Sequence, residues 1–263
     1  MMLNHGIGFL KNGKKFYYKP TFALNDLIIA LSEKHKKIFT EVYGYDDEDV
    51  VIAGYPRFDD MIDESAQCEF GELITFMPTF RDGEDNIGEE FKKTELYLAT
   101  KHLMTDSQLI DFLEKHQITL AVYLHQNIQK NTDMLNDFVS DRVKVIKQGE
   151  YNVQRLLKES KCLITDYSSV FFDFIYMAKP FISYQFDYEK FIASRKDKAF
   201  LDFKKDLPGY VVETHQKLLT TIQEIVQNDY TFSDEHKRKS KEFFQYNDTE
   251  NCRRVFEAIQ KVG

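Results

Sequence analysis

The chain has 263 residues, of which 43% are hydrophobic and 30% charged, and this composition is typical of a soluble protein with one large or two modest domains. The formal net charge of -8 argues against non-specific nucleic-acid binding, because no net positive field attracts a phosphate backbone. Cys68, Cys162 and Cys252 are widely spaced and form no CxxC motif, so the sequence indicates neither a disulfide framework nor a thiolate metal site. No apolar run approaches the roughly 20 residues that span a bilayer, and we expect a cytoplasmic protein.

The first 65 residues lack the regular pattern of the rest of the chain. A basic and aromatic run, Lys11–Lys19, suits either anionic lipid headgroups or phosphorylated substrate, but it is equally typical of a solvated surface. Apolar segments follow at Leu24–Ser32 and Val50–Ala53, and the polar segment Glu64–Glu72 suggests a domain junction. We expect residues 1–65 to be the edge or remnant of one domain and residues 66–263 to form a second domain.

From about residue 70, short apolar or β-branched runs alternate with stretches of helical period, which predicts βα units and a parallel sheet. The predicted strands are Leu73–Met77, Ile118–Leu124, Val143–Ile146, Cys162–Thr165 and Phe181–Tyr184. The predicted helices are Ser107–His116 (capped by Asp106), Ile128–Val139, Val153–Glu159, Ser169–Met177, Thr214–Gln227, Asp234–Phe244 and Thr249–Val262. The fold class is therefore α/β, with a Rossmann-like parallel sheet.

Polar side chains follow the ends of successive predicted strands. Thr79 and Arg81 follow the first strand, His125 the second, the segment Asp166–Ser169 the fourth and Asp187 the fifth. Because ligands of open parallel sheets bind beyond the carboxyl ends of the strands, we expect these side chains to converge on one site.

Ser168 and Ser169 lie between a predicted buried strand and a predicted helix. They are either a plain helix cap or part of a phosphate cradle, and the two interpretations are about equally supported by the serines alone. Asp166 and Asp173 bracket this turn, where a carboxylate near a phosphate is unfavourable unless it orients a cation, a hydroxyl or a serine. Asp173 is alternatively a first-turn helix acid.

Arg81 and His125 are the other candidates at the strand ends. The planar guanidinium of Arg81 suits two-pronged contact with a diphosphate, whereas its alternative role is an ion pair with Asp82 or with another loop. His125 closes an apolar strand and precedes polar residues, so its near-neutral pKa suits proton transfer or phosphate contact. Composition alone assigns no role to His5.

Several enzyme classes lose their main support because their motifs are missing from the sequence. There is no Gly-x-Gly-x-x-Gly, no Walker-type Gly-Lys-Ser/Thr, no His-Glu-x-x-His and no Gly-x-Ser-x-Gly. These absences argue against a dehydrogenase, a P-loop NTPase, a zinc protease and an α/β-hydrolase.

A set of motifs in a fixed order resembles the CDP-glycerol glycerophosphotransferase family, the teichoic-acid and capsule polymer enzymes of bacteria. The motifs are His5-Gly6, Gly54–Asp59 (Gly-Tyr-Pro-Arg-Phe-Asp), Pro78–Asp82 (Pro-Thr-Phe-Arg-Asp), Leu124-His125, Thr165–Asp173, Lys179-Pro180, Tyr184-x-x-Asp187, Asp206–Gly209 and Arg253–Val255. The resemblance spans nearly the whole chain and implies the C-terminal, donor-binding half of a GT-B fold.

The resemblance implies transfer of glycerol phosphate or ribitol phosphate from CDP-glycerol or CDP-ribitol to a hydroxyl of a lipid-linked cell-wall or capsule polymer, with release of CMP. His5 and His125 become the base and phosphate-stabilising candidates. Arg81 becomes a pyrophosphate contact, Ser168 and Ser169 the donor-phosphate cradle, and the other predicted donor-binding residues are Thr79, Asp166, Asp173 and Asp187. No cofactor or obligatory metal is expected. The implied location is the inner face of the plasma membrane, where the protein is peripheral.

Two features depart from the family pattern. The family's Leu-His-Pro reads Leu124-His125-Gln126 here, and glutamine does not fix φ as proline does. His5 lies almost at the start of the chain, where family members carry a whole N-terminal Rossmann-like domain, so we expect a truncated chain or a separately encoded N-terminal half. The alternatives are a nucleotide-sugar glycosyltransferase of GT-B type and a catalytically silent nucleotide-binding remnant.

Overall fold

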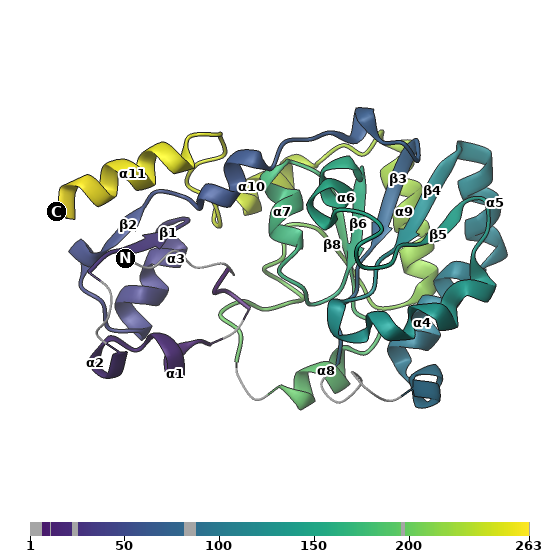
Figure 1. Ribbon diagram of the computed structural model, residues 1–263, viewed down its shortest axis with the longest axis horizontal. Helices are drawn as coiled ribbons and strands as arrows, with labels where there is room; N and C mark the ends of the chain where they lie inside the picture. The colour runs from purple at the N-terminus through teal and green to yellow at the C-terminus, as the bar shows by residue number, and fades with distance from the viewer. Residues whose placement is uncertain (1–6, 11, 23–25, 82–87, 196–197, 263) are drawn as a thin grey trace.

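A six-stranded parallel sheet forms the centre of the larger part of the molecule (Figure 1). The computed structural model describes residues 7–10, 12–22, 26–81, 88–195 and 198–262. The strands of this sheet are β3 (Glu72–Phe76), β4 (Ile118–Val122), β5 (Val143–Val145), β6 (Cys162–Thr165), β7 (Phe181–Tyr184) and β8 (Tyr210–Val212). Every strand pairs with its neighbours in parallel.

The strand order is β5-β4-β3-β6-β7-β8. Numbered from β3, this is the 3-2-1-4-5-6 order of a Rossmann sheet, in which the chain leaves the first strand toward one edge and the fourth strand toward the other. The topological switch point, where the strand order reverses, therefore lies beyond the carboxyl ends of β3 and β6. The predicted α/β, Rossmann-like class is confirmed.

Helices cover both faces of this sheet. On one face, α6 (Val153–Glu159) and α7 (Phe171–Tyr176) pack into a core that also contains the N-terminal segment. On the other face, buried side chains come from α4 (Glu95–Thr105), α5 (Ser107–His116), η6 (Gln126–Phe138) and α9 (His215–Gln227). The remaining elements of this part are the 3₁₀ helices η4 (Ser65–Gln67) and η5 (Gly88–Lys93), and the helices α8 (Tyr188–Ser194) and α10 (Asp234–Ser240).

The five predicted strands of this sheet are all present, with ends that differ by at most two residues. The prediction omitted β8, which is only three residues long, and α4, whose N-cap Thr94 accepts a hydrogen bond from the Tyr97 amide at 3.1 Å. The predicted helix Ile128–Val139 is a run of 3₁₀ turns, and the helix predicted from Ser169 begins at Phe171. Asp106 caps α5 as predicted, accepting from the Leu109 amide.

The N-terminal part contains a small parallel sheet of its own, β1 (Ile28–Ala30) and β2 (Val50–Ile52). The chain between these strands forms α3 (Glu33–Lys37), a π-helical turn η1 (Ile38–Val42) and a 3₁₀ turn η2 (Asp47–Asp49). Two one-turn helices, α1 (Lys14–Tyr17) and α2 (Lys19–Phe22), precede β1, and η3 (Pro56–Asp60) follows β2. A strand–helix–strand unit of this kind is the building block of a parallel sheet.

The last helix, α11 (Asn251–Val262), returns to this N-terminal part and does not pack on the six-stranded sheet (Figure 1). The core is also continuous between the two parts, because the Phe58 ring stacks on Tyr176 of α7 at 4.5 Å. A division of the chain into two domains near residue 65 stays a prediction. In space, α11 packs with the N-terminal part, although it is the last helix in the sequence. Among the described residues, no helix combines the length and apolar character that a bilayer crossing needs.

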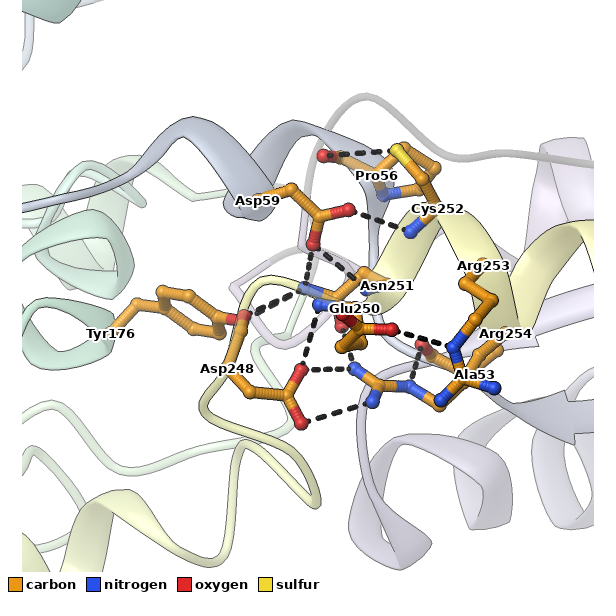
Figure 2. Close-up of polar contacts among 10 residues, drawn as sticks. All are labelled: Ala53, Pro56, Asp59, Tyr176, Asp248, Glu250, Asn251, Cys252, Arg253 and Arg254. Carbon is orange, nitrogen blue, oxygen red and sulfur yellow. Dashed lines mark hydrogen bonds and ion pairs between the residues drawn. The ribbon is translucent and has the colours of Figure 1, made fainter.

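Asp59 attaches the start of α11 to η3 (Figure 2). Its carboxylate accepts hydrogen bonds from the Asn251 amide at 2.8 Å, the Asn251 side chain at 2.7 Å and the Cys252 amide at 2.7 Å. The two backbone amides have no acceptor within the helix, so Asp59 caps a helix that begins 192 residues after it. Arg254 adds a bond to the Ala53 carbonyl at 3.0 Å. The Gly54–Asp59 motif and the Arg253–Val255 motif therefore meet at one junction.

His35 makes the stability of the N-terminal part dependent on pH. It is fully buried between aromatic rings, its Nδ1 accepts from the Leu31 amide, and burial lowers its pKa to about 3. In the unfolded chain this histidine protonates near pH 6.5. The contribution of the neutral ring to the free energy of unfolding is therefore complete above pH 6.5 and is lost as pH falls toward 3. We expect the free energy of unfolding to fall by up to about 1.4 kcal/mol per pH unit below pH 6 from this group.

Urea unfolding at pH 7.5, 6.5 and 5.5 measures this dependence. His35→Gln keeps an acceptor for the Leu31 amide but does not titrate, so its loss of stability over this range should be smaller than that of the wild type. His116→Gln, at an exposed position of α5, should keep the wild-type dependence. Equal pH dependence in wild type and His35→Gln would contradict the prediction.

Candidate functional site

The ends of β3, β6 and β7 are joined by one arginine and two carboxylates. Arg81 donates from Nε and from an Nη to the two oxygens of Asp187, at 2.7 and 2.9 Å, and the same Nη lies 3.0 Å from an oxygen of Asp166. The other oxygen of Asp166 accepts from the Thr79 amide at 2.9 Å and from the Tyr167 amide at 2.6 Å. The switch point is therefore spanned by a buried ion-pair network.

Aromatic rings enclose the Arg81 guanidinium. Its carbon lies 5.2 Å from the Tyr167 ring centre and 5.3 Å from those of Phe186 and Phe191, and Tyr167 stacks on Phe191 at 3.7 Å. The Arg81 side chain is only 11% exposed. Burial lowers the pKa of Arg81, but the attraction of Asp166 and Asp187 outweighs it and raises the pKa above its ordinary value.

The sequence left open whether Arg81 contacts a diphosphate or forms an ion pair, and the structure shows it in ion pairs with two other loops. With its guanidinium held by Asp166 and Asp187, Arg81 sets the positions of the loops that follow β3, β6 and β7. The network carries two negative charges and one positive, so it does not by itself attract an anion. A direct contact between Arg81 and a pyrophosphate stays a prediction.

Ser168 and Ser169 lie at the turn between β6 and α7, as predicted. The Ser168 hydroxyl accepts from the Val170 amide at 3.3 Å, and the Ser169 carbonyl accepts from the Phe172 amide at 3.1 Å. Ser169 is exposed and Ser168 half-buried. The Ser168 bond is an ordinary local turn contact, whereas the exposed Ser169 side chain is accessible to a ligand.

Asp173 points to the N-terminal part of the chain. Its carboxylate accepts from Arg57 at 2.5 Å, and burial raises its pKa, against which the Arg57 charge acts. Arg57 belongs to the Gly54–Asp59 motif, so this ion pair joins that motif to the helix after Ser168 and Ser169. The Arg57 side chain is 38% exposed. Arg57 was not among the site residues predicted from the sequence, although its place within the Gly54–Asp59 motif could have identified it.

His125 caps the 3₁₀ run η6 at the carboxyl end of β4. Its Nδ1 accepts from the Asn127 amide at 3.2 Å, and its ring lies 4.6 Å from that of Phe80, which sits between Thr79 and Arg81. A neutral imidazole that accepts at Nδ1 carries its proton on Nε2. Neutral His125 is therefore a donor at Nε2.

Thr79, Arg81, Asp166 and Asp187 are in mutual contact, and Ser168 and Ser169 follow directly from Asp166. His125 adjoins this group through Phe80, and Asp173 adjoins it through α7. His5 and Asp82 lie outside the described residues.

The 3-2-1-4-5-6 sheet defines the class of protein: a GT-B-like α/β chain whose topological switch point lies at the ends of β3 and β6. Residues 8–261 match the family model described as CDP-Glycerol:Poly(glycerophosphate) glycerophosphotransferase. The chain belongs to this family of bacterial teichoic acid biosynthesis transferases, as its motifs predicted.

Two curated relatives illustrate the similarity. The minor teichoic acid biosynthesis protein GgaB of Bacillus subtilis is 28% identical over 274 residues, which cover 100% of this chain and 29% of GgaB. The teichoic acid ribitol-phosphate polymerase TarK of Staphylococcus aureus is 24% identical and is matched over 95% of this chain and 48% of TarK. The chain thus spans half or less of the length of either relative.

Among solved structures, a variant of the wall teichoic acid polymerase TagF soaked with CDPG superimposes with a TM-score of 0.68 at 20% identity. The match covers 93% of this chain and 60% of TagF. At this level of identity the likeness establishes the fold.

Proposed function

We propose that this chain binds a CDP-polyol and transfers glycerol phosphate or ribitol phosphate to a hydroxyl of a lipid-linked cell-wall or capsule polymer. The observation that carries the proposal is the convergence of Thr79, Arg81, Asp166, Ser169 and Asp187 at the switch point of the sheet. Family membership supports the reaction type, and the soak of TagF with CDPG, which we take as CDP-glycerol, supports the donor class.

In the proposed reaction, an oxygen of the acceptor hydroxyl attacks the phosphorus that carries the polyol. The bond from that phosphorus to the bridging oxygen breaks, the electron pair leaves with CMP, and the hydroxyl proton passes to a base. The geometry of His125, which presents an Nε2–H when neutral, favours the phosphate-stabilising role over that of the base. His5 is then the proposed base.

The buried network holds the site for this reaction. Asp166 fixes the amides of Thr79 and Tyr167, and Arg81 fixes Asp166 relative to Asp187. Ser168, Ser169 and the exposed part of Arg57 are the groups proposed to meet the donor phosphates, with Asp173 orienting Arg57. Preorganised donors of this kind stabilise the charge that develops at phosphorus without reorganising during the reaction.

Calorimetric titration with CDP-glycerol and with CDP-ribitol tests the donor assignment. We expect one of them to bind, and the Ser168→Ala/Ser169→Ala variant to bind at least about 10-fold more weakly, because even one hydrogen bond to a charged phosphate contributes about 1.5–3 kcal/mol. Ser107→Ala, an exposed serine on the opposite face of the sheet, is the matched control and should bind like wild type. Binding of neither donor contradicts the proposal.

Product analysis distinguishes the reaction types. Release of CMP in the presence of a lipid-linked acceptor supports polyol-phosphate transfer, whereas release of a nucleoside diphosphate from a sugar donor selects a glycosyltransferase. Donor binding without turnover, restored by a separately supplied N-terminal half, supports a split enzyme. Donor binding that never leads to turnover would indicate that the chain is a catalytically silent nucleotide-binding remnant. We propose that the active assembly works at the inner face of the plasma membrane, where the lipid-linked acceptor is found.

A further inference from the structure

A cluster of two histidines and one aspartate lies on the helices that cover the opposite face of the sheet from α7. His102 is in the last turn of α4, Asp106 caps α5, and His215 begins α9. In the part of the chain that the structure describes, this is the group of His, Cys, Asp and Glu side chains whose ligand atoms gather closely enough to hold one ion, all within 4.8 Å of one another. None of the three belongs to the donor site.

The geometry of the cluster is close to that of a coordination sphere. His215 Nε2 lies 3.1 Å from one oxygen of Asp106, and His102 Nε2 lies 3.9 Å from the same oxygen. Two ligand atoms bound at about 2.0–2.1 Å to a tetrahedral Zn²⁺ are about 3.3–3.4 Å apart. The two distances bracket this value, so each histidine–aspartate pair reaches it with a shift below about 1 Å.

The two imidazole rings are also oriented for a shared ion. They stack with their centres 3.6 Å apart and their planes 14° from parallel. Both Nε2 atoms approach the same Asp106 oxygen, so the stacked rings present one nitrogen each to a common point. The other oxygen of Asp106 accepts from the Leu109 amide at 2.9 Å, which fixes the carboxylate and leaves the first oxygen for the ion.

We propose that His102, Asp106 and His215 form a binding site for a divalent transition metal of the Zn²⁺, Co²⁺ or Ni²⁺ type. Two imidazoles and one carboxylate suit these ions and do not suit Mg²⁺ or Ca²⁺, which take oxygen ligands. The His102 side chain is 58% exposed, so the ion enters from solvent and water completes its coordination.

The proposed ion joins three elements that are distant in the sequence. It ties the corner between α4 and α5 to the first turn of α9, which follows β8 after two residues. The last residue of β8, Val212, accepts a hydrogen bond at 2.7 Å from the amide of Gln185, two residues before Asp187 of the donor site. The ion therefore stabilises the outer edge of the sheet next to the site and takes no part in phosphoryl transfer.

The test is titration of the EDTA-treated full chain with ZnCl₂ at pH 7.5, by calorimetry and by thermal unfolding. We expect one equivalent of Zn²⁺ to bind and the unfolding midpoint to rise. Asp106→Asn keeps the helix cap, because asparagine caps as well as aspartate, but loses the charged ligand. It should bind Zn²⁺ at least about 10-fold more weakly, as should His102→Ala, because loss of even an outer-shell partner costs 10–100-fold.

His116→Ala is the matched control, since it removes an exposed histidine from the same pair of helices and should leave Zn²⁺ affinity unchanged. Co²⁺ in place of Zn²⁺ gives a second readout, a visible absorption band that should be present in wild type and absent from His215→Ala. The proposal is overturned if wild type takes up no stoichiometric Zn²⁺, Co²⁺ or Ni²⁺. It is equally overturned if Asp106→Asn and His102→Ala bind Zn²⁺ as tightly as wild type.

Discussion

Replacement of Arg81 by methionine is expected to lower the free energy of unfolding by about 3–5 kcal/mol, because it leaves two buried carboxylates without their shared partner. Asp166 and Asp187 are 1% and 7% exposed, and each is ion-paired to Arg81 in the folded chain. Methionine retains the volume of the side chain, so the loss reports the missing charge and hydrogen bonds. Urea unfolding at pH 7.5 measures it.

Arg253→Met is the matched control for this variant. Arg253 also contacts two carboxylates, those of Glu250 and Glu257, but its side chain is 58% exposed on α11. Exposed ion pairs of this kind contribute about 0–1 kcal/mol, so the control should lose little stability. Arg81→Lys restores the charge but not the two-pronged contact with Asp187 and should fall between wild type and Arg81→Met. Similar losses of stability in Arg81→Met and Arg253→Met would contradict the expectation that the buried network contributes more to the free energy of unfolding than exposed ion pairs do.

Replacement of Gly54 by alanine is expected to cost about 3–4 kcal/mol of stability. Gly54 has φ of +77°, a conformation that costs a non-glycine residue about 1–2 kcal/mol. In addition, an added Cβ would lie 1.8 Å from the side-chain oxygen of the fully buried Asn251. Asn251 must then move and loses bonds to Asp59 and Arg254, each worth about 1 kcal/mol. The glycine of the Gly54–Asp59 motif is thus required by the junction with α11.

Gly71 separates the two contributions. It has φ of +74°, but a Cβ there meets nothing within 4 Å, so Gly71→Ala should show the backbone cost alone. In an Asn251→Ala background the obstruction is gone, and the further cost of Gly54→Ala should fall to about that of Gly71→Ala. Equal costs for Gly54→Ala in wild type and in Asn251→Ala, measured by urea unfolding, would contradict this explanation.

The sequence alone determined the fold class and predicted which residues meet at the ends of the strands. Alternation of short apolar runs with helical periods identified five strands of the large sheet, because a strand buried on both faces needs a continuous apolar run. The residues after those strands were then expected to converge, since parallel strands end at one edge. Thr79, Arg81, Asp166 and Asp187 do so. The ordered motifs also identified the family.

Only the tertiary structure decided which partners these residues take. Arg81 could reach a ligand, Asp82 or another loop, and nothing local to the sequence distinguishes these, because both of its carboxylate partners lie at least 85 positions away in the chain. The same is true of Asp59, whose capped helix follows 192 residues later, and of the ion pair between Arg57 and Asp173, 116 residues apart. The cluster of His102, Asp106 and His215 likewise depends on α4 and α9 packing side by side. Local pattern determines elements through backbone and burial preferences, whereas contacts between distant side chains depend on how those elements pack.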